Sequence, residues 1–184
     1  MIELLKETDA LLDGHFLLSS GKHSNRYVQC ARILRYPDKA EAILKSVSEK
    51  LKDMKIDMLV GPAMGGILVA YELGRQLGIE AIFTERVDNI MALRRGFEVK
   101  EGMKIVICED VVTTGKSSME VKTLLESMGG EVIAIASIID RTNTEIELPV
   151  ISSLRVDIDT YDADDCPLCK QGSKAIKPGS RKMD

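Results

Sequence analysis

The sequence predicts a single α/β domain with a central parallel sheet flanked by helices. Apolar stretches rich in Val and Ile alternate along the chain with stretches in which apolar residues recur at helical spacing. Repeated strand–helix units of this kind favour a parallel sheet that is covered on both faces. The 184 residues can bury one well-formed core and are too few for two comfortable domains.

The individual elements have recognisable start and stop signals. Pro37 is expected to begin a helix, and Gly78 to end the next one. The expected elements, in chain order, are a first helix over 2–12, short strands over 16–30, a helix from 37, a strand over 56–60, a helix ending near 78, a strand over 81–86, a hairpin around 93–99, a strand over 103–109, a helix ending at 129, and strands over 131–140 and 154–160.

Composition narrows the class of protein. The chain has 25 basic and 29 acidic residues and a net charge of -4, so it lacks the excess of positive charge that favours binding to nucleic acids or membranes. No window approaches the length of a spanning helix. The N-terminus, MIELLKETDALL, is acidic and amphipathic, whereas a signal peptide has a basic start and an unbroken apolar segment. We therefore expect a cytoplasmic enzyme.

The most informative stretch is VICEDVVTTGKSS, residues 106–118. A buried strand ends in two adjacent carboxylates, Glu109 and Asp110, and a turn of small and hydroxyl residues leads into a helix. Free backbone amides and the helix dipole favour a phosphate at such a turn. The two acids can accept hydrogen bonds from sugar hydroxyls on the same ligand. The pattern therefore indicates a phosphorylated ribose.

Two other interpretations of this stretch fit less well. The P-loop also ends in Gly-Lys-Ser, but it needs a glycine where Asp110 stands, and a carboxylate there would repel a triphosphate. The chain has no G-x-G-x-x-G, which removes the main argument for a dinucleotide site. An ordinary strand-to-helix turn capped by Ser117 remains open, although capping does not explain paired acids at a buried strand end.

Three informative turns follow predicted strands, over 61–66, 110–117 and 140–141. Ligands of open parallel sheets bind outside the carboxyl ends of the strands. We therefore expect these turns to converge on one site.

The segment EDVVTTGKS, residues 109–117, resembles the phosphoribosyl pyrophosphate (PRPP) signature of type I phosphoribosyltransferases. Further segments resemble the orotate phosphoribosyltransferases in particular: FLLSSGKHSNRYVQ, GPAMGGILVA, LRRGFEV, the pair Asp140-Arg141, and the tail DCPLCKQG with KPGSR. The resemblance implies the type I phosphoribosyltransferase fold, with a core over about 37–153. It also implies a small hood from about 1–36 and 154–184, a mobile loop over about 85–100, and a homodimer.

In the family, PRPP binds at the signature and at the turn GPAMGG. A tight turn before a helix explains Pro62 and Gly66 equally well. Some family members have a lysine where Gly65 stands, so here positive charge is expected from the loop, with Arg94 and Arg95 as candidates beside Arg86. Glu109, Asp110 and Arg86 are the expected catalytic residues. The expected PRPP-binding residues are Met64, Gly65, Gly66, Arg86, Glu109, Asp110, Val111, Val112, Thr113, Thr114, Gly115, Lys116 and Ser117.

For the base, the resemblance implies contacts from Tyr27, Val28, Thr113 and Arg141 to orotate. A guanidinium can bind a carboxylate in a bidentate way, although a surface ion pair is the simpler explanation of Arg141. The implied reaction is attack of orotate N1 on the anomeric carbon of PRPP, giving orotidine 5'-monophosphate and pyrophosphate in pyrimidine biosynthesis. Mg²⁺ is expected mainly on PRPP oxygens and water, with no dedicated protein ligands.

Two rival functions stay open. A purine phosphoribosyltransferase would share the PRPP turn but not an arginine that binds a carboxylate. A PRPP-sensing regulator would keep the fold without catalysis, and it should show a nucleic-acid surface, which neither a basic helix nor a separate domain provides.

The chain has four cysteines. Cys30 and Cys108 are isolated, and the latter falls inside a predicted buried strand. Cys166 and Cys169 form one Cys-x-x-Cys, which is half of a structural zinc site. A dimer or the histidines His15 and His23 could complete it, and an exposed thiol pair is the alternative.

Overall fold

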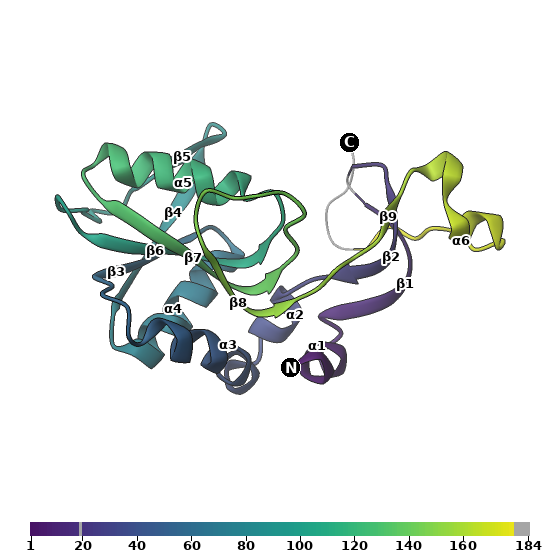
Figure 1. The fold of residues 1–184 in the computed structure, drawn as a ribbon, viewed down its shortest axis with the longest axis horizontal. Helices are drawn as coiled ribbons and strands as arrows, with labels where there is room; N and C mark the ends of the chain where they lie inside the picture. The colour runs from purple at the N-terminus through teal and green to yellow at the C-terminus, as the bar shows by residue number, and fades with distance from the viewer. Residues whose placement is uncertain (19, 179–184) are drawn as a thin grey trace.

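The computed structural model describes residues 1–18 and 20–178. The strands form one sheet of six and one of three. Figure 1 shows helices on both faces of the larger sheet and the smaller sheet beside it. The larger sheet has the strand order β5-β4-β3-β6-β7-β8. Its strands are β3 (Met58–Pro62), β4 (Glu80–Val87), β5 (Ile90–Ala92), β6 (Lys104–Val112), β7 (Glu131–Asp140) and β8 (Val150–Arg155). All neighbouring pairs are parallel except the β4–β5 hairpin, so the carboxyl ends of β3, β6 and β7 meet at one edge.

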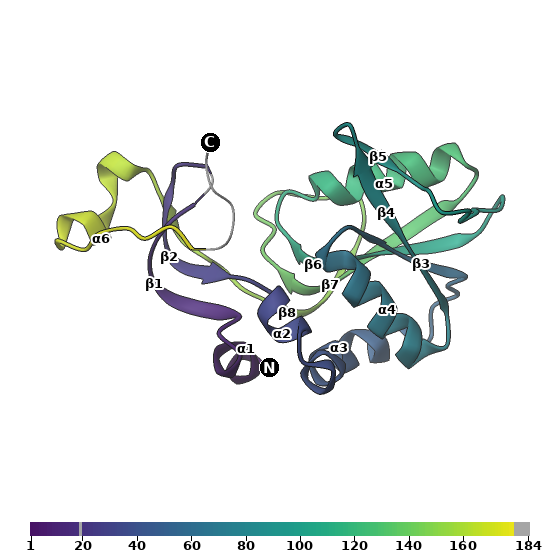
Figure 2. The ribbon, with the colours of Figure 1, turned by 180° about the vertical axis from the view of Figure 1, so that it is seen from behind.

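Three long helices cover the larger sheet (Figure 2). Helices α3 (Pro37–Leu51) and α4 (Gly65–Leu77) lie on one face, and α5 (Lys116–Ser127) lies on the other. The first face forms a core cluster that includes Ile43, Leu73 and Val106, and the second includes Leu125 and Ile107. Each such side chain contributes about 1.5–3 kcal/mol when it is fully buried. The predicted α/β fold, with a mostly parallel sheet between helices, is confirmed.

The two ends of the chain build the smaller sheet, which we call the hood together with the short helices beside it. Its antiparallel strand order is β1-β2-β9. The hood elements are α1 (Ile2–Glu7), β1 (Leu11–Leu17), β2 (His23–Val28), β9 (Thr160–Tyr161), the 3₁₀ helix η1 (Ala163–Asp165) and α6 (Pro167–Lys170), and α2 (Ala31–Leu34) leads from it to α3. Figure 1 shows the hood to one side of the main sheet, on the side where β8 leads away from it.

Three element predictions were wrong in their limits. The first helix ends at Glu7 rather than near 12, because Asp9 adopts a left-handed φ of 53° and Leu12 pairs within β1. The hairpin is β4–β5, turned at Asp88 and Asn89, which also have positive φ. Residues 93–99 form no strand, and their apolar side chains pack on the second core cluster.

The last predicted strand, over 154–160, is divided between the two sheets. β8 begins earlier, at Val150, and pairs in parallel with β7, whereas Thr160 belongs to β9 in the hood. The alternating apolar residues of 154–158 therefore belong to the end of β8 and to the segment that connects the main sheet to the hood. In the ranges 1–18 and 20–178, no helix combines the length and the apolar character that crossing a bilayer requires.

Candidate active site

A cavity of about 450 Å³ lies at the carboxyl edge of the main sheet, where the turns after β3 and β6 meet. Of the thirteen predicted PRPP-binding residues, all except Gly66 line it. The cavity is also lined by Pro62, Ala63, Met91 and Ser118. The expected convergence of the first two turns on one space is therefore present.

Glu109 and Asp110 lie side by side at this cavity without a basic partner. Burial and the neighbouring charge of Asp110 raise the pKa of Glu109 to about 8, although the Ser118 hydroxyl donates to its Oε1 at 3.5 Å. Burial also raises the pKa of Asp110, whose Oδ1 accepts the Val111 N–H at 3.0 Å. Within the described residues, neither carboxylate forms an ion pair. The pair can therefore gain from a ligand that donates hydrogen bonds to both.

The turn between β6 and α5 leaves backbone amides free. Gly115 precedes the helix with a left-handed φ of 69°, and no side chain caps the helix start. The suggested cap by Ser117 is therefore wrong. Thr114 Oγ1 instead accepts a long hydrogen bond from the Lys116 N–H at 3.4 Å. Because the first helical N–H groups point outward and the dipole is positive here, this turn can bind an anion.

The glycines of the turn GPAMGG have different roles. A Cβ on Gly66 would lie 2.4 Å from the carbonyl oxygen of Cys108, so this glycine lets α4 approach β6 closely. A Cβ on Gly65 would instead lie 2.5 Å from Cγ of Asp110, beside the cavity. The Ala63–Met64 peptide bond is cis, and Met64 is 82% exposed. Gly66 is therefore needed for the packing of α4 on β6, in agreement with a tight turn before a helix. Gly65 leaves space for the Asp110 carboxylate.

The three candidate arginines lie in different surroundings. Arg86, at the end of β4, lines the cavity, forms an ion pair with Glu120 and donates to the Asn89 carbonyl at 3.0 Å. Arg94 and Arg95 pair with Glu85 at 3.7 and 3.1 Å, away from the cavity lining. Of the three candidates, Arg86 is therefore the one that lines the same cavity as the paired acids.

A second cavity, of about 570 Å³, adjoins the first and shares Thr113 and Thr114 with it. Its lining includes the basic residues Arg141 and Lys22 and the acidic residues Asp157 and Asp159. Burial lowers the pKa of Arg141, and its Nε has no hydrogen-bond partner among the described residues. The preceding Asp140 pairs with Arg155 at 3.1 Å rather than with Arg141. A half-buried guanidinium whose buried Nε has no partner among the described residues favours an incoming carboxylate.

Tyr27 and Val28 line neither cavity. Tyr27 packs against Phe16, with the ring centroids 5.8 Å apart, and Val28 packs on the first core cluster. Sequence reasoning also missed Lys22 and Ser118. Ser118 could have been found from its place next to Ser117 in the first turn of the helix. Lys22 had no such signal, because only the hood fold brings it to the second cavity.

Comparison with known proteins assigns the chain to a family. The phosphoribosyl transferase domain family matches residues 30–158. The orotate phosphoribosyltransferase of Caldicellulosiruptor saccharolyticus is 50% identical over 184 residues, which is 99% of this chain and 96% of that protein. The chain belongs to the orotate phosphoribosyltransferase family.

Solved structures of this and a related family share the fold. The orotate phosphoribosyltransferase from Aeropyrum pernix has a TM-score of 0.72 at 23% identity, over 84% of this chain and 92% of that one. An adenine phosphoribosyltransferase from Rhodothermus marinus DSM 4252 has a TM-score of 0.64 at 17% identity, over 85% of this chain and all of that one, at 100%. Because structures named for different bases share it, the fold alone does not identify the base.

Proposed function

We propose that this protein transfers the phosphoribosyl group of PRPP to N1 of orotate, giving orotidine 5'-monophosphate and pyrophosphate for pyrimidine biosynthesis. One observation supports this most directly: a cavity with paired acids at a helix start adjoins a second cavity with the half-buried Arg141 guanidinium, and both share Thr113 and Thr114. The first suits a phosphorylated sugar, and the second suits a planar anionic base. The 50% identity to an orotate phosphoribosyltransferase supports the same substrates.

The PRPP contacts follow from the first cavity. The 5'-phosphate binds the amides of 113–117 at the start of α5, where the N-cap residue Gly115 has no side chain and only the long Thr114 Oγ1 contact to the Lys116 N–H competes. Glu109 and Asp110 accept hydrogen bonds from the ribose hydroxyls, which favours their charged forms and offsets their burial. The pyrophosphate lies along the turn 63–65, with Arg86 on the other wall. Arg86 must exchange its ion pair with Glu120 for this contact.

The base contacts follow from the second cavity. The Arg141 guanidinium binds the orotate carboxylate, which supplies the partner that its buried Nε otherwise lacks. Lys22 adds positive charge on the hood side of the same cavity. Thr113 lies at the boundary and contacts both substrates. Tyr27 and Val28 would need a movement of the hood, or a partner subunit, to reach the base.

The chemistry is displacement at the anomeric carbon. The C1–O bond to pyrophosphate breaks and the bond to N1 of orotate forms, through a transition state with oxocarbenium character. The proton on N1 is released as this bond forms, and an oxygen of the departing pyrophosphate can accept it. The charged pair Glu109 and Asp110 stabilises positive charge on the ribose, while Arg86 stabilises negative charge on the departing pyrophosphate. The segment over 85–100 acts as a lid that excludes water, which would otherwise compete with orotate.

Magnesium fits the first cavity. Two carboxylates and several hydroxyls offer the hard oxygen donors that Mg²⁺ prefers, and neither Glu109 nor Asp110 forms an ion pair with a described residue. Bound to the oxygens of PRPP, Mg²⁺ supplies charge neutralisation for the leaving pyrophosphate. Glu109 and Asp110 would hold it mainly through water and the ribose hydroxyls. Omitting Mg²⁺ should therefore abolish turnover while leaving the fold intact.

We also propose a homodimer, as the resemblance to the family implies. In that arrangement Arg94 or Arg95 leaves Glu85 and reaches the active site of the neighbouring subunit. Mixing an Asp110→Asn protein with an Arg94→Gln/Arg95→Gln protein tests this, because one restored site per heterodimer returns activity only if the arginines act in trans. The cytoplasmic location stays a prediction.

A direct assay tests the base specificity. The absorbance of orotate is followed with PRPP and Mg²⁺, beside parallel reactions with adenine, hypoxanthine and uracil. We expect orotate to be consumed with stoichiometric release of pyrophosphate, and the three other bases to remain. Consumption of a purine with orotate unchanged would overturn the substrate assignment and favour a purine phosphoribosyltransferase. Binding of PRPP without consumption of any base would favour a PRPP-sensing protein.

A further inference from the structure

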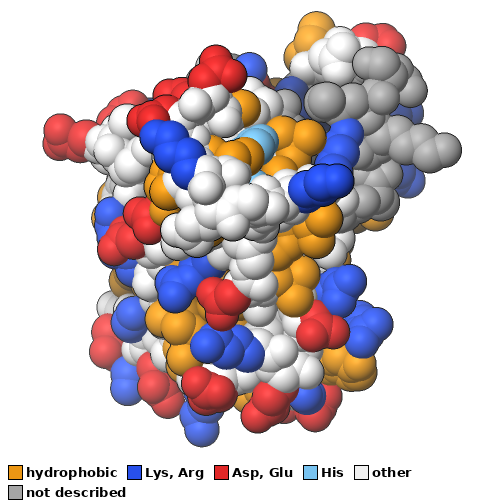
Figure 3. All heavy atoms as spheres, turned by 90° about the vertical axis from the view of Figure 1, so that its right-hand side faces the viewer, with side chains coloured by type: hydrophobic (Ala, Val, Ile, Leu, Met, Phe, Trp, Pro, Cys, Tyr) orange, Lys and Arg blue, Asp and Glu red, His pale blue; other side chains and the backbone are white. Residues whose placement is uncertain are grey.

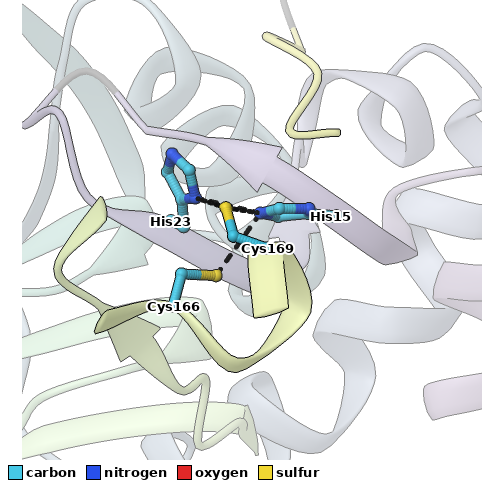
Figure 4. A group of neighbouring side chains, drawn as sticks. All are labelled: His15, His23, Cys166 and Cys169. Atoms are coloured by element: carbon cyan, nitrogen blue, oxygen red, sulfur yellow. Dashed lines mark hydrogen bonds between the residues drawn. The ribbon is translucent and has the colours of Figure 1, made fainter. Parts of the chain in front are cut away.

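Four side chains with metal-binding atoms meet in the hood, away from both cavities. His15 on β1 and His23 on β2 face Cys166 and Cys169 (Figure 4). Cys166 directly precedes α6, and Cys169 lies within it. Their four ligand atoms all lie within 4.8 Å of one another. None of the four residues lines the proposed active site. The cluster therefore needs an explanation that the transferase reaction does not supply.

The distances agree with a tetrahedral metal site. The His15 Nε2 atom lies 3.5 Å from Cys166 Sγ and 3.8 Å from Cys169 Sγ, and His23 Nδ1 lies 3.4 Å from Cys169 Sγ. With Zn–S bonds of about 2.3 Å and Zn–N bonds of about 2.0–2.1 Å, tetrahedral ligand atoms are about 3.3–3.8 Å apart. The two nitrogens, at 2.9 Å, need to separate by only about 0.4 Å.

Hydrogen bonds alone explain the close approach of the four side chains less well than a bound metal ion does. His15 Nε2 faces three polar atoms, from His23, Cys166 and Cys169. One ring nitrogen has either a single proton or a single lone pair, so it can satisfy one of them. His15 and Cys166 are buried, at 6% and 1% exposure, where unsatisfied polar atoms are costly. A metal ion at the centre satisfies all four at once.

The surroundings of His15 prepare it as a ligand. Its other ring nitrogen, Nδ1, lies 3.1 Å from the Ser173 hydroxyl. The Ser173 hydroxyl can accept from an Nδ1–H, and in that tautomer the Nε2 lone pair is directed at the cluster, as is common for zinc-bound histidines. Cys169 is exposed, and Figure 3 shows a histidine side chain at the surface of the hood among hydrophobic side chains, so an ion can reach the cluster.

We propose that His15, His23, Cys166 and Cys169 bind one structural Zn²⁺ ion that joins the two ends of the chain. Four protein ligands with two thiolates and two imidazoles form a closed site, which is typical of structural rather than catalytic zinc. His15 and Cys166 are 151 residues apart in sequence, so the ion closes a very long loop. It holds α6 against the β1–β2 hairpin, in a sheet whose third strand, β9, has only two residues. Zinc thus stabilises a small sheet that has little core of its own.

Metal analysis tests the proposal. The untagged wild-type protein, expressed with added zinc and passed over a desalting column, should contain about one zinc ion per chain by mass spectrometry. Cys166→Ser/Cys169→Ser should contain none, and its thermal midpoint should fall by about 5–15 °C. Cys30→Ala removes a buried thiol outside the cluster and should keep its zinc. Wild-type protein without zinc, or equal zinc in the double-serine variant, would overturn the proposal.

Cobalt substitution provides a test that does not depend on the folding of a variant. Wild-type protein stripped by a chelator and reloaded with Co²⁺ should show the intense visible bands of four-coordinate cobalt and thiolate charge-transfer bands. Added zinc should bleach both. The weak spectrum of octahedral cobalt, or a Cys166–Cys169 disulfide in freshly prepared wild-type protein, would contradict a site with two thiolate ligands.

Discussion

The Asp110 carboxylate fills the space beside the α-carbon of Gly65, where a Cβ would lie 2.5 Å from the Asp110 Cγ. The two residues come from different elements: Gly65 begins α4, after the turn that follows β3, and Asp110 lies within β6. The position of the acid therefore depends on the absence of a side chain across the cavity. This contact couples the turn proposed for pyrophosphate to the acids proposed for the ribose.

Gly65→Ala should displace Asp110 and lower kcat/KM for PRPP by about 10–100-fold, because a displaced catalytic group loses its alignment. Steady-state kinetics at varied PRPP measure this. Asp110→Ala removes the clashing carboxylate, so adding Gly65→Ala to it should cost little more. Full activity of Gly65→Ala alone would show that Asp110 can accommodate a methyl group at position 65 without losing its alignment.

Asp110→Asn keeps the shape of the side chain and removes its charge. We expect kcat to fall by about 10²–10³-fold, because a neutral amide stabilises the oxocarbenium transition state poorly. The thermal midpoint should stay the same or rise, since a buried charge is lost. Asp53→Asn, at an exposed acid after α3, serves as the control. Native turnover of Asp110→Asn with a native melting curve would remove the catalytic role of this carboxylate.

Glu109→Gln should change stability in a pH-dependent way. Burial raises the pKa of Glu109 from 4.5 to about 8, so between these pH values the folded protein binds more protons here than the unfolded chain. Stability therefore falls as pH rises through this window, and Glu109→Gln removes the loss. The variant should gain roughly 1–3 kcal/mol over wild type at pH 8.5 and almost nothing at pH 4.5.

Urea denaturation of both proteins without substrates at the two pH values measures this gain, with exposed Glu98→Gln as the control. A gain that is equal at both pH values would mean that Glu109 titrates normally in the folded protein.

Sequence reasoning succeeded where one local segment specifies both the structure and the site. Residues 106–118 predict an apolar strand, two acids and a helix start in succession; the structure has β6 and α5 in that order, with the two acids inside β6, which continues to Val112. It failed where local patterns compete with long-range packing. Leu93 and Phe97 looked like strand residues, but they pack against the second core cluster without pairing. The turn of the real hairpin depends on positive φ at Asp88 and Asn89.

The family resemblance implied a hood built from both ends of the chain, but the residue contacts within it had no local signal in the sequence. His15, His23 and the Cys166–Cys169 pair were each visible as possible zinc ligands, but their meeting depends on the pairing of β2 with β9. The same pairing brings the turn before β2, with Lys22, to the second cavity. Neither arrangement has a local signal, because the residues involved are more than 100 positions apart.

Arg141→Lys should raise the KM for orotate by about 10–100-fold and leave the KM for PRPP almost unchanged. Lysine keeps the charge but loses the bidentate geometry that a guanidinium offers to a carboxylate. Initial rates at varied orotate and saturating PRPP measure the effect, with exposed Arg35→Lys as the control. Equal changes in both KM values would indicate a structural role for Arg141.

Arg86→Gln should lower kcat by about 10–100-fold, because the departing pyrophosphate loses a positive charge. Glu120→Gln removes the partner that holds Arg86 in the free protein and should lower the KM for PRPP. Opposite effects of the two substitutions, measured by the same pyrophosphate-release assay, support an exchange of partners. A loss of activity in Glu120→Gln would indicate that the ion pair itself is needed.

A crystal structure of the protein with PRPP and Mg²⁺ tests the central claim most directly. We expect the 5'-phosphate at the amides of 113–117, the ribose hydroxyls within hydrogen-bond distance of Glu109 and Asp110, and the pyrophosphate along 63–65 beside Arg86. PRPP bound elsewhere, with the cavity between the turns after β3 and β6 empty, would contradict the account.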